Sequence, residues 1–281
     1  MSILIVGGKG QLGLALRAKY PEARWVDIDE LDITSKEAVE SFDWSDIDTI
    51  LNAAAYTNVD GAETEEGKKF ARAVNAEAVA NLAEVAKKKD ATLVHISTDY
   101  VFDGTINPHT EDEPFSPLSV YGRTKAEGDK AVMGVPKHYL IRTSWVIGEG
   151  KNFVRTMLDL GKQGVNPTVV SDQVGRLTFT SELVLAIDHL LSVKAPFGTY
   201  NVSNDGEPAS WAEITRTIFK EAGLENTVNN TTTEEYYKGK ANIAPRPLQS
   251  TLDLGKIQTT GFKPRDWHED LKEYVKKETS S

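Results

Sequence analysis

The chain has 281 residues, and its 42 Asp and Glu residues outnumber its 32 Lys and Arg residues, which gives a formal net charge of −10. This acidic balance argues against a nucleic-acid-binding protein, which usually presents a basic face, and a hydrophobic content of 40% excludes wholesale disorder. The absence of cysteine excludes a disulfide framework, thiolate catalysis and cysteine-ligated metal sites, and it is compatible with a reducing cytoplasm. No run approaches the roughly 18 apolar residues of a membrane helix, and the amino terminus lacks the apolar core of a signal peptide. We therefore expect a cytoplasmic protein of one large or two coupled domains that binds neither nucleic acid nor membrane.

Strand and helix signals alternate through the first half of the chain. Strands are expected at residues 3–6, 25–28, 49–52, 92–97 and 139–142, and helices at residues 12–19, 36–42 and 70–87. This alternation is typical of βαβ units, so it predicts an α/β fold with a doubly wound, Rossmann-like parallel sheet.

The second half of the chain is less regular. Strands are expected at residues 168–171 and 199–202, helices at residues 182–191, 211–222 and 271–277, and a polar loop at residues 226–235. We predict a dinucleotide-binding domain over residues 1–148, to which residues 175–203 return. Residues 149–174 and 204–281 are expected to form a smaller α/β substrate-binding lobe packed closely against it.

A glycine-rich turn follows the first expected strand and opens the first expected helix. Its sequence is Gly7-Gly8-Lys9-Gly10-Gln11-Leu12-Gly13. Glycines at positions 7, 10 and 13 allow a tight turn, close approach to a pyrophosphate and close helix packing, and the free N–H groups at the helix start attract the anion. We predict that this turn, including Gln11 and Leu12, binds a dinucleotide; the alternative is a purely structural turn, since the spacing differs from the commoner Gly-x-Gly-x-x-Gly pattern.

An acidic residue about 20 positions further on is expected to meet the adenosine ribose. Asp27 stands there, at the end of the second strand, and its carboxylate can accept a hydrogen bond from a 2′-hydroxyl and repel a 2′-phosphate, which favours NADH over NADPH. The neighbouring Asp29, Glu30 and Asp32 leave this assignment open. Asp32 and the following Ile33 are placed to flank an adenine.

Tyr121 and Lys125 are four positions apart and should share one face of a helix. A phenol has a pKa of about 10, and a neighbouring ammonium lowers it, so the pair can perform acid–base chemistry on an alcohol or ketone. This spacing also arises by chance. It gains weight from Ser97 and Thr98, which end a strand at the edge where open α/β sheets bind ligands. His95, inside the same apolar strand, is expected to be a hydrogen-bonded core residue.

Seven strings together resemble the extended short-chain dehydrogenase/reductase superfamily and, within it, the dTDP-4-dehydrorhamnose reductase family. They lie at residues 7–13, 52–63 (NAAAYTNVDGAE), 97–104 (STDYVFDG), 117–125 (PLSVYGRTK), 142–146 (RTSWV), 172–175 (DQVG) and 246–253 (RPLQSTLD). The resemblance covers most of the chain, and the strings are specific only in combination.

The resemblance implies that NADH or NADPH delivers hydride to the C4 ketone of a dTDP-4-keto-6-deoxy sugar, dTDP-4-dehydro-L-rhamnose, in the last step of dTDP-L-rhamnose synthesis. By this pattern Tyr121 protonates the C4 oxygen, Lys125 holds the nicotinamide ribose and lowers the tyrosine pKa, and Thr98 donates a hydrogen bond to the same oxygen.

The same resemblance implies binding residues around these three. Ala53, Ala54 and Ala55 leave room for the cofactor, and Asp99 and Trp145 contact the sugar, whose apolar patch suits a tryptophan face. The alternative for Trp145 is ordinary core packing.

Two further residues are candidates for the substrate diphosphate. Asn152 offers an amide donor and Arg246 a bidentate guanidinium, although a surface salt bridge is the alternative for Arg246. Gln173 either binds the nucleotide or orders its own loop.

Some members of this family hold a magnesium ion with glutamates at a dimer interface. Ala15 stands where the first of these glutamates is expected, while Glu182 and a carboxyl-terminal glutamate could supply others. The five histidines show no metal-ligand spacing. We therefore expect no metal, and the sequence leaves monomer and homodimer open.

Two rival functions remain at this level. A nucleotide-sugar dehydratase would carry Asp-Glu after the strand-end threonine, but Tyr100 follows Asp99 here; an epimerase of another keto sugar is not separated by sequence. A non-catalytic regulatory subunit, like that of methionine adenosyltransferase, also resembles this family, although Tyr121, Lys125 and Thr98 are all present. The cofactor preference, the stereochemistry of the sugar, and a 3,5-epimerase as partner or fusion are also left open.

Overall fold

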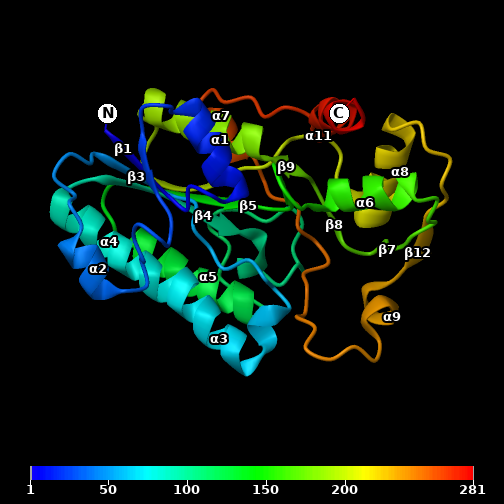
Figure 1. Ribbon diagram of the computed structural model, residues 1–281, viewed down its shortest axis with the longest axis horizontal. Coiled ribbons are helices and arrows are strands. Elements are labelled where there is room, and N and C mark those ends of the chain that lie inside the picture. Colours follow the sequence, from blue (N-terminus) through cyan, green and yellow to red (C-terminus); the bar gives the residue numbers. More distant parts are fainter. Residues whose placement is uncertain (1, 281) are drawn as a thin grey trace.

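A six-stranded sheet forms the larger lobe of the structure, a computed structural model that describes residues 2–280 (Figure 1). The strand order is β10-β5-β4-β3-β1-β2, and every neighbouring pair is parallel. The strands are β1 (Ile3–Val6), β2 (Arg24–Val26), β3 (Thr49–Asn52), β4 (Thr92–Thr98), β5 (His138–Thr143) and β10 (Gly198–Asn201). The chain leaves β1 toward β2 and returns to β3 on the other side, so the predicted doubly wound sheet is confirmed, with its switch point between β1 and β3.

Helices cover both faces of this sheet, which explains its continuous apolar strands (Figure 1). One layer comprises α1 (Gln11–Lys19) and α7 (Thr180–Ser192); the other comprises α2 (Lys36–Ser41), α3 (Glu65–Arg72), α4 (Ala78–Lys89) and α5 (Val120–Met133). Alternate residues of β1 enter opposite cores: Ile3 and Ile5 pack with Leu16 of α1, whereas Leu4 and Val6 pack with Leu82 of α4. The short α10 (Gly255–Thr259) lies against β10.

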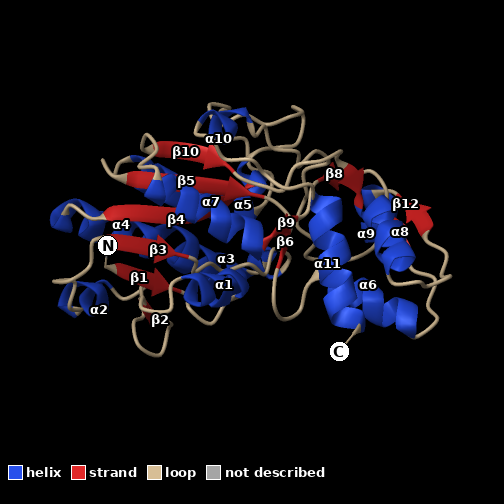
Figure 2. Cartoon of the chain, turned by 90° about the horizontal axis from the view of Figure 1, so that it is seen from above, coloured by secondary structure: helices blue, strands red, loops and turns tan. Residues whose placement is uncertain are grey.

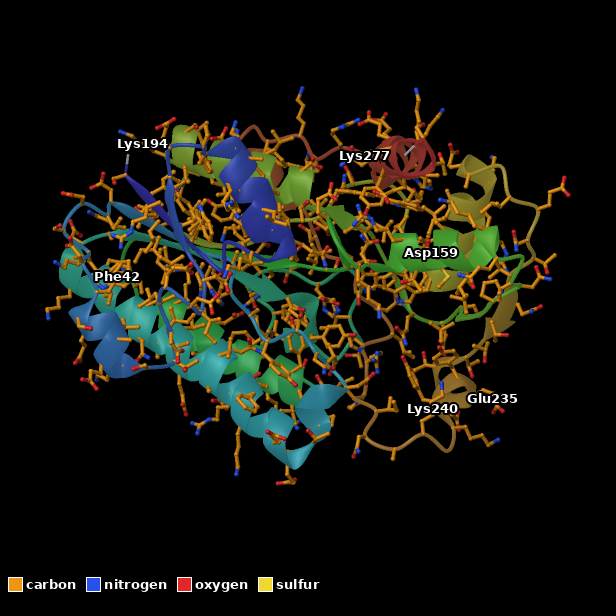
Figure 3. The ribbon with its side chains drawn as sticks, in the orientation of Figure 1. Phe42, Asp159, Lys194, Glu235, Lys240 and Lys277 are labelled. Carbon is orange, nitrogen blue, oxygen red and sulfur yellow. The ribbon has the colours of Figure 1, made fainter. Side chains whose placement is uncertain are left out.

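A third apolar core lies in the second half of the chain. It is built from α6 (Phe153–Lys162), α8 (Trp211–Glu221) and α11 (Trp267–Thr279), with the two-stranded pairs β6 (Val146–Ile147) and β9 (Thr178–Phe179), β7 (Thr168–Val170) and β12 (Asn229–Thr231), and β8 (Val174–Gly175) and β11 (Ala209–Ser210). Figure 2 shows the carboxyl ends of the large sheet directed toward this smaller lobe. In Figure 3, Glu235 of α9 (Thr233–Tyr237) and Lys240, which follows that helix, lie far from Phe42 at the opposite end of the molecule.

Two local predictions were wrong. Residues 226–235, expected to be a loop, contain β12 and the start of α9: β12 pairs in parallel with β7, and the Thr232 side chain caps α9 by accepting from the Glu235 N–H. The helix expected at residues 70–87 begins earlier, because Thr64 caps α3, and it continues through a π-helical turn, Ala73–Glu77, into α4. Across residues 2–280, no helix combines the length and apolar character needed to cross a membrane.

Candidate active site

Two adjoining cavities lie at the carboxyl ends of the large sheet. The first, the glycine-turn cavity, has a volume of about 340 Å³ and is lined by Val6, Gly7, Lys9, Gly10, Asp27, Ile28, Leu31, Asp32, Ile33, Thr34, Ala53, Ala54, Ala55 and Val74. The second, the tyrosine cavity, measures about 430 Å³, and its lining includes Gln11, Leu12, Thr98, Asp99, Tyr100, Tyr121, Lys125, Ser144 and Trp145. Gly10, Ala53 and Ala55 line both, so the two cavities are neighbours that share these residues as a common wall.

The glycine turn is shaped by its contact with β3 and α1. Gly7 has a φ of +81°, and a Cβ there would lie 2.7 Å from the Ala54 nitrogen; a Cβ at Gly13 would lie 2.1 Å from the Gly7 oxygen. A Cβ at Gly10 would meet that oxygen at an ordinary 3.5 Å. Packing therefore requires glycine at 7 and 13, although Gly13 itself lies behind the cavity. Since no side chain caps the start of α1, its N–H groups are available to an anion.

Asp27 and Asp32 line the glycine-turn cavity, whereas Asp29 and Glu30 do not. The Asp27 carboxylate accepts hydrogen bonds from the Lys9 N–H (2.9 Å) and the Ile28 N–H (3.0 Å). The Lys9 side chain forms an ion pair with Asp29, and Glu30 accepts from the Asp27 N–H. Of the four acidic candidates for the ribose contact, Asp29 and Glu30 therefore lie outside the cavity lining.

The tyrosine cavity brings together side chains from β4 and from the start of α5. The Ser119 side chain caps α5, which places Tyr121 in its first turn and Lys125 one turn later, both buried. Lys125 Nζ donates to the Ile96 carbonyl (2.6 Å) and lies 3.3 Å from Nε2 of His95. At the end of β4 the Thr98 hydroxyl donates to Asp99 Oδ1 (3.0 Å). The predicted trio of Thr98, Tyr121 and Lys125 therefore lines one cavity.

Burial controls the electrostatics of this cavity. It raises the pKa of Tyr121 above its ordinary value; the neighbouring Asp99 adds to this, while the Thr98 hydroxyl opposes it. Burial lowers the pKa of Lys125 to about 8, against the attraction of Asp129. Burial also raises the pKa of Asp99 to about 6, although hydrogen bonds from Ser250 and Thr98 oppose the shift. Tyr121 is therefore a neutral phenol, the form that can give up a proton.

Trp145 both lines the tyrosine cavity and packs in the smaller lobe. Its indole stacks on Trp211, with ring centroids 3.8 Å apart and planes 19° apart. Its φ of +48° places the backbone in the left-handed region, which is uncommon for a bulky residue and costs conformational energy. The strained residue sits between β5 and β6, where the chain passes from the large sheet to the smaller lobe.

The structure does not bring Asn152 to either cavity. Its side chain caps α6 by accepting from the Arg155 N–H (3.0 Å), and its amide hydrogens have acceptors in the Gly148 carbonyl (2.8 Å) and the Tyr274 hydroxyl (2.8 Å). A diphosphate contact by Asn152 remains a prediction without geometric support.

Arg246 also lies outside the cavity linings. Its guanidinium donates to the Asp60 carboxylate (2.9 Å) and to the Ala244 carbonyl (2.9 Å), and it lies over the Tyr237 ring at 4.7 Å. It is close enough to Tyr100, which does line the tyrosine cavity, to lower the pKa of that phenol against the larger effect of burial. Arg246 therefore lies outside the cavity lining, in a salt bridge with Asp60 and near Tyr100.

Gln173 orders its own surroundings. Its amide donates to the Thr233 hydroxyl (3.0 Å), while the neighbouring Asp172 accepts from the same residue. This contact ties the loop after β7 to α9.

The residues considered as metal ligands do not form a cluster. Ala15 has no ligand atom, and Glu182, whose pKa is raised by burial to about 7, accepts from the Arg265 N–H (3.1 Å). Within residues 2–280 no group of three or more His, Asp or Glu side chains is arranged to hold a metal ion.

The sequence did not predict the side chains behind the trio. Asn52 and His95 are fully buried. The side-chain nitrogen of Asn52 lies 3.0 Å from Nδ1 of His95, whose Nε2 in turn contacts Lys125 Nζ. The expectation that His95 is a hydrogen-bonded core residue is confirmed. In the sequence, the alternation of side chains along β4 indicates which face of the sheet His95 is on, but it does not reveal that Lys125 of α5 is its partner.

The family model described as RmlD substrate binding domain matches residues 1–280. The chain belongs to this family. It is 40% identical to the dTDP-4-dehydrorhamnose reductase of Aggregatibacter actinomycetemcomitans, over 96% of this chain and 97% of that protein. It is 38% identical to a spore coat polysaccharide biosynthesis protein of Bacillus subtilis, over 99% and 98% of the two chains.

A solved structure supports the same relationship. The dTDP-4-dehydrorhamnose reductase of Bacillus anthracis, in complex with NADP, superimposes with a TM-score of 0.89 at 34% identity and covers 99% of this chain and 100% of that one. The similarity of this RmlD family member to both sequence and structural relatives therefore extends over both lobes.

Proposed function

We propose that this RmlD family member is a reductase that uses a reduced nicotinamide dinucleotide to convert dTDP-4-dehydro-L-rhamnose into dTDP-L-rhamnose. The observation that carries the proposal is the adjacency of the two cavities: Thr98, Tyr121 and Lys125 line a space that shares Gly10, Ala53 and Ala55 with the glycine-turn cavity. Its relatives from Aggregatibacter actinomycetemcomitans and Bacillus anthracis are dTDP-4-dehydrorhamnose reductases, which supports this substrate.

The glycine-turn cavity fits a dinucleotide. The cradle formed by Gly7, Gly10 and the uncapped start of α1 suits a pyrophosphate, and Asp27, Asp32 and Ile33 line the side where an adenosine would lie. When bound, the nicotinamide supplies a hydride to the ketone carbon. Ala53 and Ala55 line both cavities, and their small side chains leave room for the cofactor there.

The residues of the tyrosine cavity manage the proton and the charge. As hydride reaches the C4 carbon, negative charge develops on the ketone oxygen. The buried Tyr121 phenol is neutral and therefore holds a proton, which it donates to that oxygen. Thr98 supplies a second hydrogen bond there. Lys125 can donate to the ribose in either protonation state, and its ammonium form, present below its pKa of about 8, supplies positive charge to the resulting phenolate.

We propose that the smaller lobe holds the nucleotide sugar. Trp145 offers an aromatic surface to the apolar side of a 6-deoxy hexose, Asp99 accepts from sugar hydroxyls, and Arg246 moves from Asp60 to the diphosphate. Under this proposal residues 1–148 and 175–203 hold the cofactor, while residues 149–174 and 204–281 hold the substrate. The separate apolar core of the second half supports this division, and the absence of cysteine supports a cytoplasmic location.

Asp27 should make NADH the better cofactor. Its carboxylate lines the glycine-turn cavity, where a 2′-phosphate would add negative charge beside it. The ammonium of Lys9, paired with Asp29, offsets part of this repulsion and lets NADPH serve as well. Asp27→Asn should shift the ratio of the kcat/KM values for the two cofactors toward NADPH by about tenfold. A tenfold change corresponds to about 1.4 kcal/mol, a reasonable size for the repulsion between two charges near a protein surface. An unchanged ratio would assign cofactor choice to another residue.

The deciding experiment supplies the purified protein with NADH or NADPH and the keto sugar made from dTDP-glucose by a dehydratase and a 3,5-epimerase. We expect loss of nicotinamide absorbance that depends on the epimerase. Oxidation without the epimerase would point to another 4-keto sugar. No oxidation by a folded protein that binds the cofactor would overturn the enzyme and leave a regulatory subunit.

A further inference from the structure

The amine of Lys125 faces a histidine rather than a carboxylate. Lys125 and His95 are both fully buried, with 1% and 0% of their surfaces exposed, and Nζ lies 3.3 Å from Nε2. The second contact of Nζ is the Ile96 carbonyl at 2.6 Å, which can only accept. Which partner donates in the lysine–histidine contact depends on where the imidazole carries its proton.

A chain of hydrogen bonds from the backbone fixes that position. The Ala54 N–H donates to a side-chain atom of Asn52 at 3.1 Å, and a backbone N–H can only donate, so this atom is the amide oxygen. The amide nitrogen of Asn52 must then be the atom that lies 3.0 Å from His95 Nδ1. Since an amide NH₂ has no acceptor capacity, Nδ1 is the acceptor and carries no proton.

The imidazole therefore has its proton on Nε2, and an N–H group points at Lys125. A doubly protonated ring is excluded, because Nδ1 would present a second N–H to the amide of Asn52. Burial acts in the same direction by lowering the pKa of His95 well below its ordinary value. A neutral amine at Lys125 can accept from Nε2–H and donate to the Ile96 carbonyl. An ammonium has no lone pair to accept with, so one of its N–H groups would face the Nε2–H of His95.

We propose that His95, fixed in its Nε2–H tautomer by Asn52, is a positioning residue that holds the Lys125 amine and favours its neutral form. The role of Lys125 itself rests on the proposed function; the proton arrangement does not. His95 would make the loss of the lysine proton easier than burial alone does.

The other groups around Lys125 act in known directions. On α5, Tyr121 lies one turn before it and is a neutral phenol, while Asp129 lies one turn after it and attracts a positive charge. Asp129 is itself buried and lies 3.4 Å from Arg142 of β5, so much of its charge is already matched. The lowered pKa of Lys125 agrees with a surrounding that opposes the ammonium more than Asp129 supports it.

The first test reads the tautomer directly. Nitrogen NMR of protein labelled in its histidines should show one buried ring, absent in His95→Gln, with a proton on Nε2 and none on Nδ1. In Asn52→Asp both side-chain oxygens can only accept, so the proton should move to Nδ1. A wild-type ring protonated on Nδ1 would overturn the proposal.

The second test reads the charge of Lys125. In His95→Gln the amide can turn its oxygen toward Nζ and accept from the ammonium, so the titration midpoint of Lys125, followed by carbon NMR, should rise by about one pH unit, the worth of one hydrogen bond to a charged group. His138→Gln, the same substitution in β5 at a side chain bonded to the Val135 carbonyl, is the matched control and should leave the midpoint unchanged. An unmoved midpoint in His95→Gln would refute the role of His95. If His95→Gln does not fold, Asn52→Asp takes its place, because it moves the imidazole proton to Nδ1 and presents the Nε2 lone pair to Nζ. The Lys125 midpoint should then rise, and an unmoved midpoint in Asn52→Asp would refute the role of His95.

The third test connects the arrangement to turnover. The kcat/KM for the reduced nicotinamide reports groups of the free protein, so its alkaline limb should follow the Lys125 midpoint and move upward in His95→Gln. A uniform loss of activity at every pH, without a shift of the limb, would indicate a merely structural histidine. If the wild-type protein turned over no keto sugar, the proposed function would fail while the two NMR measurements would still decide the proton arrangement.

Discussion

At the residue scale, the Tyr121 hydroxyl is the proposed proton donor. Tyr121→Phe removes it and keeps the ring that packs in the cavity wall, so turnover should fall by roughly 10²-fold or more, the scale of lost general acid catalysis, while cofactor affinity stays nearly intact. Steady-state turnover and cofactor binding by fluorescence measure the two effects. The matched control is Tyr139→Phe, at a buried tyrosine that donates to the Ala195 carbonyl. Turnover like that of the wild type in the first variant would remove Tyr121 from the mechanism.

Asp99 should make the stability of the protein fall as pH rises. Burial raises the pKa of its carboxyl to about 6, above the value of about 3.9 in an unfolded chain. Between these values the folded state binds the proton more tightly, so the free energy of unfolding decreases from about pH 4 to pH 7, by at most about 3 kcal/mol.

Asp99→Asn has no such proton and should lose this dependence. Urea unfolding at about pH 4 and pH 7 should show the variant gaining stability relative to the wild type at the higher pH. The exposed Asp46→Asn controls for a general effect of removing one carboxylate. An equal difference at both pH values would mean that Asp99 does not titrate in this range.

The sequence was informative about single residues wherever spacing carries the chemistry. Tyr121 and Lys125 are one helical turn apart, and Thr98 ends a strand, so the three could be predicted to meet. The contact between His95 and Lys125 joins two elements that only the fold brings together. No spacing along the chain encodes it.

At the scale of elements, glycine has two different roles in the turn between β1 and α1: Gly13 is needed for packing, and Gly10 for the approach of a ligand. In Gly13→Ala the new methyl group would lie 2.1 Å from the Gly7 oxygen, so the turn must shift and the protein should lose several kcal/mol of stability, as overpacking does. In Gly10→Ala it would lie at an ordinary 3.5 Å but on the cavity wall, so stability should stay nearly unchanged while cofactor affinity falls.

Thermal unfolding and cofactor titration of both variants check this contrast. The comparison is internally controlled, because both variants place the same methyl group in the same turn. Equal losses of stability would contradict the assignment of Gly10 to ligand approach. Equal retention of affinity would remove the turn from the cofactor site.

Elements buried on both faces were easier to predict than those at an edge. The strands of the large sheet are continuous apolar runs because helices cover them on both sides. The strand β12 is a polar segment, mostly exposed, and only its pairing with β7 makes it a strand. Its residues therefore carry no apolar pattern from which to predict it.

At the scale of the whole molecule, the Arg246–Asp60 pair links the segment after α9 to the loop after β3. If Arg246 moves to the substrate diphosphate, Arg246→Met should raise KM for the nucleotide sugar by about 10- to 100-fold, the worth of a charged hydrogen bond, and change kcat less. Steady-state kinetics with varied sugar measure this split. The control Arg216→Met removes an exposed arginine of α8 that bonds to Asn230. A normal KM in Arg246→Met would leave Arg246 as a structural salt bridge.

The sixth strand has a consequence for how the protein is made. β10 pairs with β5, and the two strands are separated along the chain by residues 144–197, which include part of the smaller lobe and the whole of α7. A nascent chain leaving the ribosome therefore presents β5 as an open edge for all of that length, and closing this long loop is a slow kind of step. Until β10 arrives, β5 is an edge strand open to pairing with a neighbouring chain, and the addition of β10 removes that edge.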